Sequence, residues 1–337
     1  MGIADIPTKL GTDILIRTIL PGLVAFIVFF EPLIYPLIHN FWDTLETFAD
    51  KLLVWLIVGF AMGLFFMLCD IYIYQSFEGI NWPEPLRKWK YSRIQKYFEK
   101  LDDELKNLKK QEKEKLEKLE KEDNGEKKEK LTTELNELSL RIRKLSDNAR
   151  EFPPDHEKEN FTKRYPTCPT RFGNVIFEYE DYSLNRYGIH IVAFWNHFIQ
   201  VLSKETKEEL KLKSAIADLC VYLCFVSFLS IIFGPAALLL QEESWIAYGE
   251  FSIPVKSIIY LLASIVLFEL FYKLSITQHK GYGSFWKSIV DLNREELASK
   301  LGISIKKAPP ASKEELENEK CLWRKYQNYY LDYKFLK

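Results

Sequence analysis

The stretch Leu219–Leu240, LCVYLCFVSFLSIIFGPAALLL, decides the fold because none of its 22 residues carries a charge. An α-helix rises about 1.5 Å per residue, so roughly 20 apolar residues cross the hydrocarbon core of a bilayer. The run Leu52–Cys69 is also uncharged, and Ile71–Tyr74 extends it past Asp70. Runs of this length predict membrane-spanning helices.

Two further apolar runs complete the pattern. Ile14–Phe30 is interrupted only by Arg17, and Ser257–Phe268 is carried to spanning length by the apolar residues that follow Glu269. The runs are grouped as two pairs, in residues 1–75 and 214–276. We therefore predict an all-α protein with four transmembrane helices in two hairpins, together with a cytoplasmic helical domain.

The composition excludes several classes of protein. The 46 Lys and Arg residues balance 47 Asp and Glu residues, so no strong positive field attracts nucleic acid. Disorder throughout is excluded, because 47% of the residues are hydrophobic and 15% are aromatic. The five Cys residues lack paired spacing, which argues against a disulfide scaffold or a zinc ribbon.

The basic residues predict the orientation. The two short connections between paired spans are acidic, with Asp43, Glu46 and Asp50 in one and Glu242, Glu243 and Glu250 in the other. The segments on the opposite side are basic, and they contain Arg87, Lys88, Lys90, Arg93, Lys204, Lys207, Lys211, Lys213, Lys273, Lys280 and Lys287. The positive-inside rule therefore predicts a multi-pass protein, in the plasma membrane, with both termini in the cytoplasm.

Residues 76–213 are predicted to form the cytoplasmic helical domain. Within it, residues 93–150 carry two stripes of Leu and Ile at helical spacing, separated by Asn124-Gly125. Because Asn-Gly readily ends a helix, we predict an antiparallel coiled-coil hairpin. Its 17 basic and 15 acidic residues favour a solvated face over a nucleic-acid arm. Amphipathic helices are expected at about 170–203, and further cytoplasmic helices at 277–337.

A block of unusual residues stands before the third span. It reads Pro169-Thr170-Arg171-Phe172-Gly173-Asn174 and is followed by Arg186-Tyr187-Gly188-Ile189 and Trp195. This pattern resembles a family of uncharacterised bacterial four-span membrane proteins that carry Pro-Thr-Arg-Leu-Gly-Asn in the corresponding place. The present chain differs in having Phe172 and, after the Trp, Asn196-His197. The family has no established activity, so the resemblance implies the architecture alone.

Ionisable residues in the spans are the first candidates for a functional site, because burying a charge in hydrocarbon costs several kcal/mol. Asp70, Asp218 and Glu269 are expected near the cytoplasmic ends of three helices. Together they would line a cation-attracting vestibule, or a gate held by Arg17 and Lys273. The alternative is structural: Glu269 stands four residues before Lys273, and the other two carboxylates lie among lipid headgroups.

In the cytoplasmic domain, Arg171, Asn174 and Glu178 allow two interpretations. Arg171 at a helix start would bind a phosphate or a nucleotide, since free backbone amides also face an anion there. Alternatively, Arg171 pairs with Glu178 or Glu180, while Asn174 satisfies buried backbone groups. The structural interpretation is favoured, because the Arg fork suits a tertiary ion pair equally well.

Other motifs point to packing. Gly59 and Gly63 form a Gly-x-x-x-Gly pattern, which lets two helix backbones approach closely. Cys220 and Cys224 are expected to be buried, inert thiols. The sequence supports neither a metal site nor a cofactor, and an active site is unsupported because no known catalytic motif occurs.

Three functional hypotheses follow. The first is a homo-oligomeric channel or membrane-perturbing effector that contacts membrane lipid and is gated through the cytoplasmic helical domain. The second is a membrane-anchored scaffold that docks a cytoplasmic protein through the charged helical hairpin. An enzyme acting on lipid ranks last, for want of a catalytic constellation.

Overall fold

The structure is a computed structural model that forms two compact units. One unit contains Met1–Gln75 and Trp195–Leu301, and the other contains Ser76–Phe194 and Gly302–Lys337. The residues that the structure describes are 12–29, 42, 44–45, 47–122, 124–153, 166–191, 194–239, 246–248, 251–253, 255–305, 310 and 312–335. Within these residues the fold is all-α, apart from one short pair of strands.

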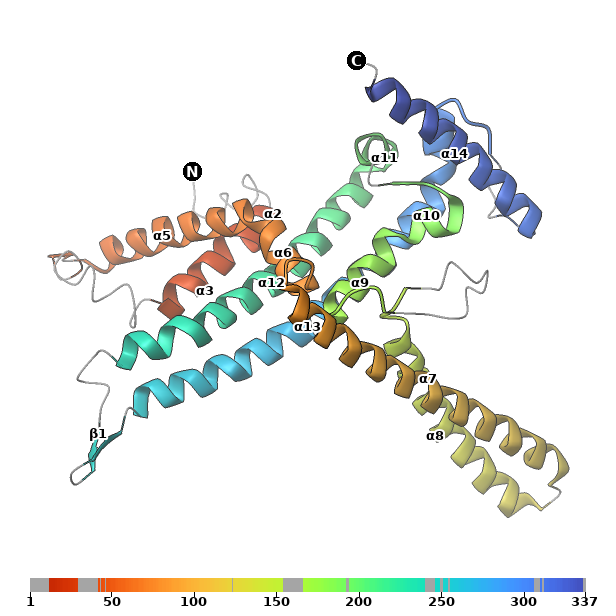
Figure 1. Cartoon of the computed structure of the whole chain (residues 1–337), viewed down its shortest axis with the longest axis horizontal. Helices are drawn as coiled ribbons and strands as arrows, with labels where there is room; N and C mark the ends of the chain where they lie inside the picture. The colour runs from red at the N-terminus through yellow and green to blue at the C-terminus, as the bar shows by residue number, and fades with distance from the viewer. Residues whose placement is uncertain are drawn as a thin grey trace. The chain divides into compact units, whose positions relative to one another are not determined.

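The first unit is a bundle of long helices. Its elements are α2 (Thr12–Ile14), the π-helical turn η2 (Leu15–Ile19), α3 (Leu20–Phe29), α5 (Phe48–Leu68), the start of α6 (Asp70–Glu78), α11 (Trp195–Val201), α12 (Lys204–Leu239), β1 (Ile246–Tyr248), β2 (Phe251–Ile253) and α13 (Val255–Lys300). Helices α12 and α13 lie side by side and run antiparallel, and α3 packs on α5 (Figure 1). The two strands pair antiparallel within the segment that connects α12 to α13.

The contact between α3 and α5 depends on glycine. A Cβ atom on Gly22 would lie 1.8 Å from the carbonyl oxygen of Gly59, and one on Gly63 would lie 1.8 Å from the carbonyl oxygen of Thr18. Both clashes are with backbone atoms, which cannot rotate away as a side chain would. The Gly-x-x-x-Gly pair of α5 therefore lies where two helix backbones touch within this chain.

The π-helical turn η2 has a cause in the sequence. Pro21 has no backbone N–H, and its ring crowds the carbonyl group four residues earlier, at Arg17. The backbone N–H of Leu20 donates to the carbonyl of Leu15, which is a five-residue step in place of the usual four. The widened turn contains Arg17, and such turns are frequent at functional sites.

Three of the described helices are long and apolar enough to cross a membrane: Phe48–Leu68, Lys204–Leu239 and Val255–Lys300. The segment Leu15–Phe29 is apolar but shorter. Large apolar side chains point outward from these helices, among them Leu53, Ile57, Leu68, Ile259, Leu262 and Val266. Polar side chains are buried between the helices, among them Thr18, Ser227, Ser230, Ser264 and His279. This distribution suits a lipid environment and supports a multi-pass membrane protein.

The observed helices run through two of the predicted domain boundaries. Helix α12 continues across 213–214, and the 46-residue α13 continues across 276–277. Residues 195–213 and 277–301 therefore belong with the bundle. Pro235 lies inside α12 and does not end it. The predicted acidic residues Asp43, Glu46, Glu242, Glu243 and Glu250 lie outside the described residues.

The second unit contains the charged hairpin, formed by α7 (Glu84–Lys121) and α8 (Gly125–Ala149). The two helices run antiparallel, because Lys115 pairs with Glu134 at 2.8 Å and Arg141 pairs with Glu104 at 2.7 Å. Leucine and isoleucine side chains form the seam between them, and the buried ones include Leu101, Leu108, Leu135, Leu138 and Ile142. The side chain of Asn124 caps α8 by accepting from the N–H of Glu126.

The remaining helices of this unit are α9 (Arg171–Glu180), α10 (Tyr182–Tyr187) and α14 (Lys313–Phe335). Helix α10 ends at Gly188, whose φ of 77° is in the left-handed region that favours glycine. The side-chain amide of Gln327 donates to the Gly188 carbonyl, and Trp323 is fully buried. The aromatic helix α14 therefore packs against α10 and its C-terminal turn.

Candidate functional site

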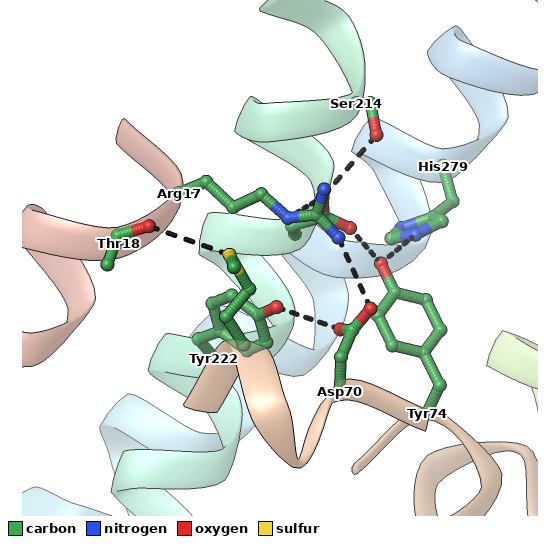
Figure 2. Close-up of polar contacts among 9 residues, drawn as sticks. Arg17, Thr18, Asp70, Tyr74, Ser214, Tyr222 and His279 are labelled. Carbon is green, nitrogen blue, oxygen red and sulfur yellow. Dashed lines mark hydrogen bonds and ion pairs between the residues drawn. The ribbon is translucent and has the colours of Figure 1, made fainter. Parts of the chain in front are cut away.

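The candidate site is a cluster of charged and polar side chains within the helix bundle, in which Asp218, Tyr222 and His279 are buried and Arg17 and Asp70 are partly exposed (Figure 2). Arg17 lies between two carboxylates. Its Nη2 atom donates to Asp70 Oδ2 at 3.2 Å, and its Nε atom lies 2.9 Å from Asp218 Oδ2. The three residues come from η2, α6 and α12, so one guanidinium group joins three helical segments.

Hydroxyl groups make further hydrogen bonds to the carboxylates. The hydroxyl of Tyr222 donates to Asp70 Oδ1 at 2.8 Å, and that of Ser214 lies 3.4 Å from Asp218 Oδ2 as a donor. Tyr222 stands four residues after Asp218 on α12, so both side chains emerge on one face of that helix. Burial of a carboxylate such as Asp218 is tolerated when it has an ion-pair partner and further hydrogen bonds, as it does here.

A second tyrosine and a histidine extend the cluster to α13. The hydroxyl oxygen of Tyr74 lies within hydrogen-bond distance of Asp218 Oδ1 and 3.0 Å from Nε2 of His279. On the other side of the ring, Nδ1 of His279 lies 2.8 Å from the carbonyl oxygen of Ser275. His279 and Asp218 are both buried, so this part of the cluster is shielded from solvent.

The structure brings together only some of the residues predicted for a pore or gate. Arg17, Asp70 and Asp218 meet, whereas Glu269 pairs with Lys273 on its own helix at 2.9 Å, with both side chains exposed. The reason is that Glu269 and Asp218 lie at different positions along the length of the helix bundle. The carbonyl of Phe268 lies beside Cys224, six residues beyond Asp218 on α12. Six residues correspond to about 9 Å along a helix, so Glu269 lies at another level.

Sequence reasoning missed Tyr74, Tyr222 and His279. The two tyrosines had a signal, since each stands four residues after a predicted carboxylate, and residues at this spacing share a helix face. His279 was assigned to the segment after the fourth span and had no such signal. It joins the cluster because α13 continues beyond the predicted boundary.

The predicted ligand candidates of the second unit have structural partners. Arg171 forms a two-point ion pair with Glu151, whose carboxylate oxygens lie 2.8 Å from Nε and from Nη2. Glu151 is buried, although the sequence did not single it out. The buried side chain of Asn174 accepts from the N–H groups of Thr167 and Cys168 and donates to the Cys168 and Thr170 carbonyls. These contacts hold the loop that enters α9.

The rest of the Pro169–Asn174 block fits closely around the end of α6. Thr170 caps α9 by accepting from the N–H of Gly173, and its hydroxyl donates to the Glu78 carbonyl at 3.2 Å. A Cβ on Gly173 would lie 2.9 Å from that same carbonyl oxygen. Burial raises the pKa of the Glu78 carboxyl, and it raises the pKa of the Cys168 thiol to about 11.

The described residues contain no group of three His, Cys, Asp or Glu side chains placed to hold a metal ion. Comparisons with family models, curated proteins and solved structures found no match to this chain. The resemblance to four-span bacterial proteins therefore stays a prediction. Function must be inferred from the contacts of the chain's own residues.

Proposed function

We propose that the chain is a four-span plasma-membrane protein that assembles as a homo-oligomeric channel or membrane-perturbing effector. Three spans are the long apolar helices α5, α12 and α13. The fourth is the helical segment 12–29, whose 18 residues extend about 27 Å and so nearly match the hydrocarbon thickness. The outward apolar side chains of these helices would contact membrane lipid.

The basic segments orient the bundle with α6, the hairpin and α14 on the cytoplasmic side. In this orientation the Arg17 cluster lies at the inner ends of the spans, because Asp70 follows α5 directly and Asp218 stands where the uncharged run of α12 begins. Two carboxylates at this depth would attract cations once water reaches them.

One observation carries the proposal: a single, partly buried guanidinium group holds helical segments from both hairpins together. Arg17 and Asp70 belong to the first hairpin, and Asp218 belongs to the second. The Arg17 and Asp70 side chains are 36% and 30% exposed and only Asp218 is buried, so removing one partner should cost less than the ~3–5 kcal/mol typical of a fully buried ion pair. We therefore treat Arg17, Asp70 and Asp218 as a latch that holds the closed state, with the conducting path formed between copies.

Helix α6 would transmit the gating movement. Near its start, Asp70 and Tyr74 take part in the buried cluster. At its end, Phe77 packs on Phe172 with ring centroids 6.2 Å apart, and the Glu78 carbonyl accepts from Thr170. The helix has nine residues and no Pro or Gly, so displacement of its end would pull on the latch.

The test is conductance of the purified full chain in planar bilayers. Arg17→Gln opens the latch, and we expect its open probability to rise about tenfold, as for a coupling free energy of ~1.4 kcal/mol. Asp218→Asn should act in the same direction. The matched control is Lys273→Gln, which removes an exposed ion pair of the neighbouring helix and should leave conductance unchanged. Absence of conductance in both wild type and Arg17→Gln would overturn the proposal.

A second candidate is the membrane-anchored scaffold, in which the charged hairpin docks a cytoplasmic protein. It is favoured by one observation: charged side chains of the hairpin such as Lys106 and Arg141 are 67% and 64% exposed, so its surface is highly charged. Deleting residues 93–150 distinguishes the two functions. A scaffold would lose its partner in a pull-down, whereas a channel core would still assemble and conduct.

A further inference from the structure

The hydroxyl group of Tyr74 lies between two side chains, and each of them can form a hydrogen bond with it. Asp218 Oδ1 is on one side, and His279 Nε2 is 3.0 Å away on the other. We name Asp218, Tyr74 and His279 the relay. Its hydrogen bonds are short enough to be direct, without an intervening water.

Counting donors fixes the number of protons in the relay. A carbonyl oxygen only accepts, so Nδ1 of His279 must carry the hydrogen that points at Ser275. Tyr74 has a single O–H, which serves either Asp218 or Nε2 of His279 but never both. Whichever group it does not serve must itself donate to the tyrosine oxygen. At least one proton therefore resides on Asp218 or on Nε2 of His279.

Counting charges is consistent with one added proton, and the hydrogen-bond count is what places that proton on Asp218 or His279. Arg17 contributes one positive charge, and Asp70 and Asp218 contribute two negative charges when both are ionised. The partly buried cluster would then carry a net negative charge, which is costly between membrane helices because Asp218 itself is buried. One added proton makes the cluster neutral.

We infer that the bundle contains a proton-binding site, in which one proton is shared along the relay in two arrangements. In the first, protonated Asp218 donates to the Tyr74 oxygen, and Tyr74 donates to Nε2 of neutral His279. In the second, the carboxyl O–H bond has broken, the tyrosine oxygen has gained that proton, and its own has moved to Nε2. Asp218 is then an anion and His279 a cation, with all protons conserved.

The charged and titratable groups around the relay come from every packed element. They are Arg17 from η2, Asp70 from α6, Tyr222 from α12 and His279 itself from α13. Arg17 favours an anionic Asp218, 2.9 Å away, and therefore the second arrangement. Ser214 assists through its hydroxyl.

The site of the proton sets the strength of the latch, an effect that rests on the proposed function. When His279 carries the proton, ionised Asp218 pairs fully with Arg17. When Asp218 carries it, Arg17 keeps a charged partner in Asp70 alone. Proton movement through Tyr74 thus changes the attraction between the two hairpins without any change in total charge.

The test is spectroscopic and uses the full chain in nanodiscs. Nitrogen NMR with labelled histidine reports whether Nε2 of His279 is protonated, and infrared spectroscopy with labelled aspartate reports a protonated Asp218 carboxyl. His279→Gln and Asp218→Asn assign the two signals. At pH 7 we expect one of the two groups to be protonated in the wild type. Ionised Asp218 together with unprotonated Nε2 at that pH would overturn the inference.

A pair of tyrosine variants tests the role of the relay. Tyr74→Phe removes the hydroxyl between the two groups, so we expect the carboxyl and histidine signals to titrate in separate steps rather than in one. Tyr222→Phe is the matched control, because its hydroxyl serves Asp70 and should leave the single step intact. Identical titration of both variants would contradict the relay.

These spectra and the conductance recordings fail independently. A protonated relay in a protein that never conducts would leave the proton site standing and remove the channel. A conducting protein with no proton on Asp218 or on Nε2 of His279 would support the channel and remove the proton site.

Discussion

The helix bundle and the α7–α8 hairpin are built from opposite distributions of side chains. In the bundle, apolar residues such as Leu262 point outward and the ion pairs of Arg17 lie between the helices, where Asp218 is buried. In the hairpin, Leu138 and Ile142 are buried, and the ion pairs lie outside. Both regions are antiparallel helix pairs, so helix geometry does not explain the difference.

The comparison teaches that different forces hold the two regions. Water drives the leucines of the hairpin together, because burying them removes apolar surface from solvent. Lipid offers no such drive between helices, so the bundle depends on close backbone approach at glycine and on buried polar contacts. Each region should therefore be sensitive to a different kind of substitution.

The largest effect is expected at Gly63 of the bundle. In Gly63→Ala the new methyl group would lie 1.8 Å from the carbonyl oxygen of Thr18, so η2 and α5 must separate. We expect a loss of about 3 kcal/mol in unfolding free energy, measured by thermal unfolding in detergent. Gly281→Ala is the control, because nothing lies within 4 Å of its Cβ. Equal unfolding of the two variants would argue against glycine packing.

In the hairpin, Leu138→Ala should cost about 2–3 kcal/mol, since it opens a cavity in a water-driven seam. The neighbouring Leu140 is 67% exposed, so Leu140→Ala should change the unfolding free energy by less than about 0.5 kcal/mol. Hydrogen exchange of the α8 backbone amides, measured in the full chain, gives the loss of stability in each of the two variants. If the two variants exchange alike, the hairpin does not have the seam described.

A pH-dependent effect is expected where α6 ends. Burial raises the pKa of Glu78 above its ordinary value of 4.5, so the folded state holds the proton more tightly than the unfolded state. Stability should therefore fall as the pH rises from about 4.5 through the raised pKa, and level off above it. Glu78→Gln should flatten this decline in a series of thermal melts, whereas Glu84→Gln, at an exposed position, should preserve it.

The smallest effect is expected for the exposed ion pairs of the hairpin. Arg141 and Glu104 lie in contact at 2.7 Å with exposed side chains, so Arg141→Gln should cost under about 1 kcal/mol. Added salt should remove even that difference, because it screens exposed charges. A loss of several kcal/mol, measured by chemical denaturation, would erase the contrast with the less exposed ion pairs of Arg17.

The sequence predicted those features that depend on local composition. The uncharged run Leu219–Leu240 and the Leu stripes around Asn124-Gly125 each indicate a helix through their own residues. The meeting of Arg17 with Asp70 was harder to predict, because 53 residues separate them and their contact depends on how deeply each helix inserts. Tyr74 and Tyr222 matter through partners that no local pattern reveals.

The sequence contains an indication that α13 is continuous, and the prediction of the domain boundary did not use it. The predicted boundary at 276–277 followed the loss of apolar character after Leu274, yet no Pro occurs between 255 and 308. A helix that leaves an apolar environment continues if nothing stops it, since its hydrogen bonds are internal. This difference is why His279 was absent from the predicted site.

Because α13 is continuous, it should not tolerate insertions or deletions of residues. Inserting one residue between Glu269 and Ser275 would rotate everything downstream by about 100° and advance it by about 1.5 Å. His279 would then leave Tyr74, and Trp286 would leave the ring of Trp195, with which it stacks at a centroid distance of 4.8 Å. Length variation among relatives should therefore be tolerated in the connections and be absent from this rod.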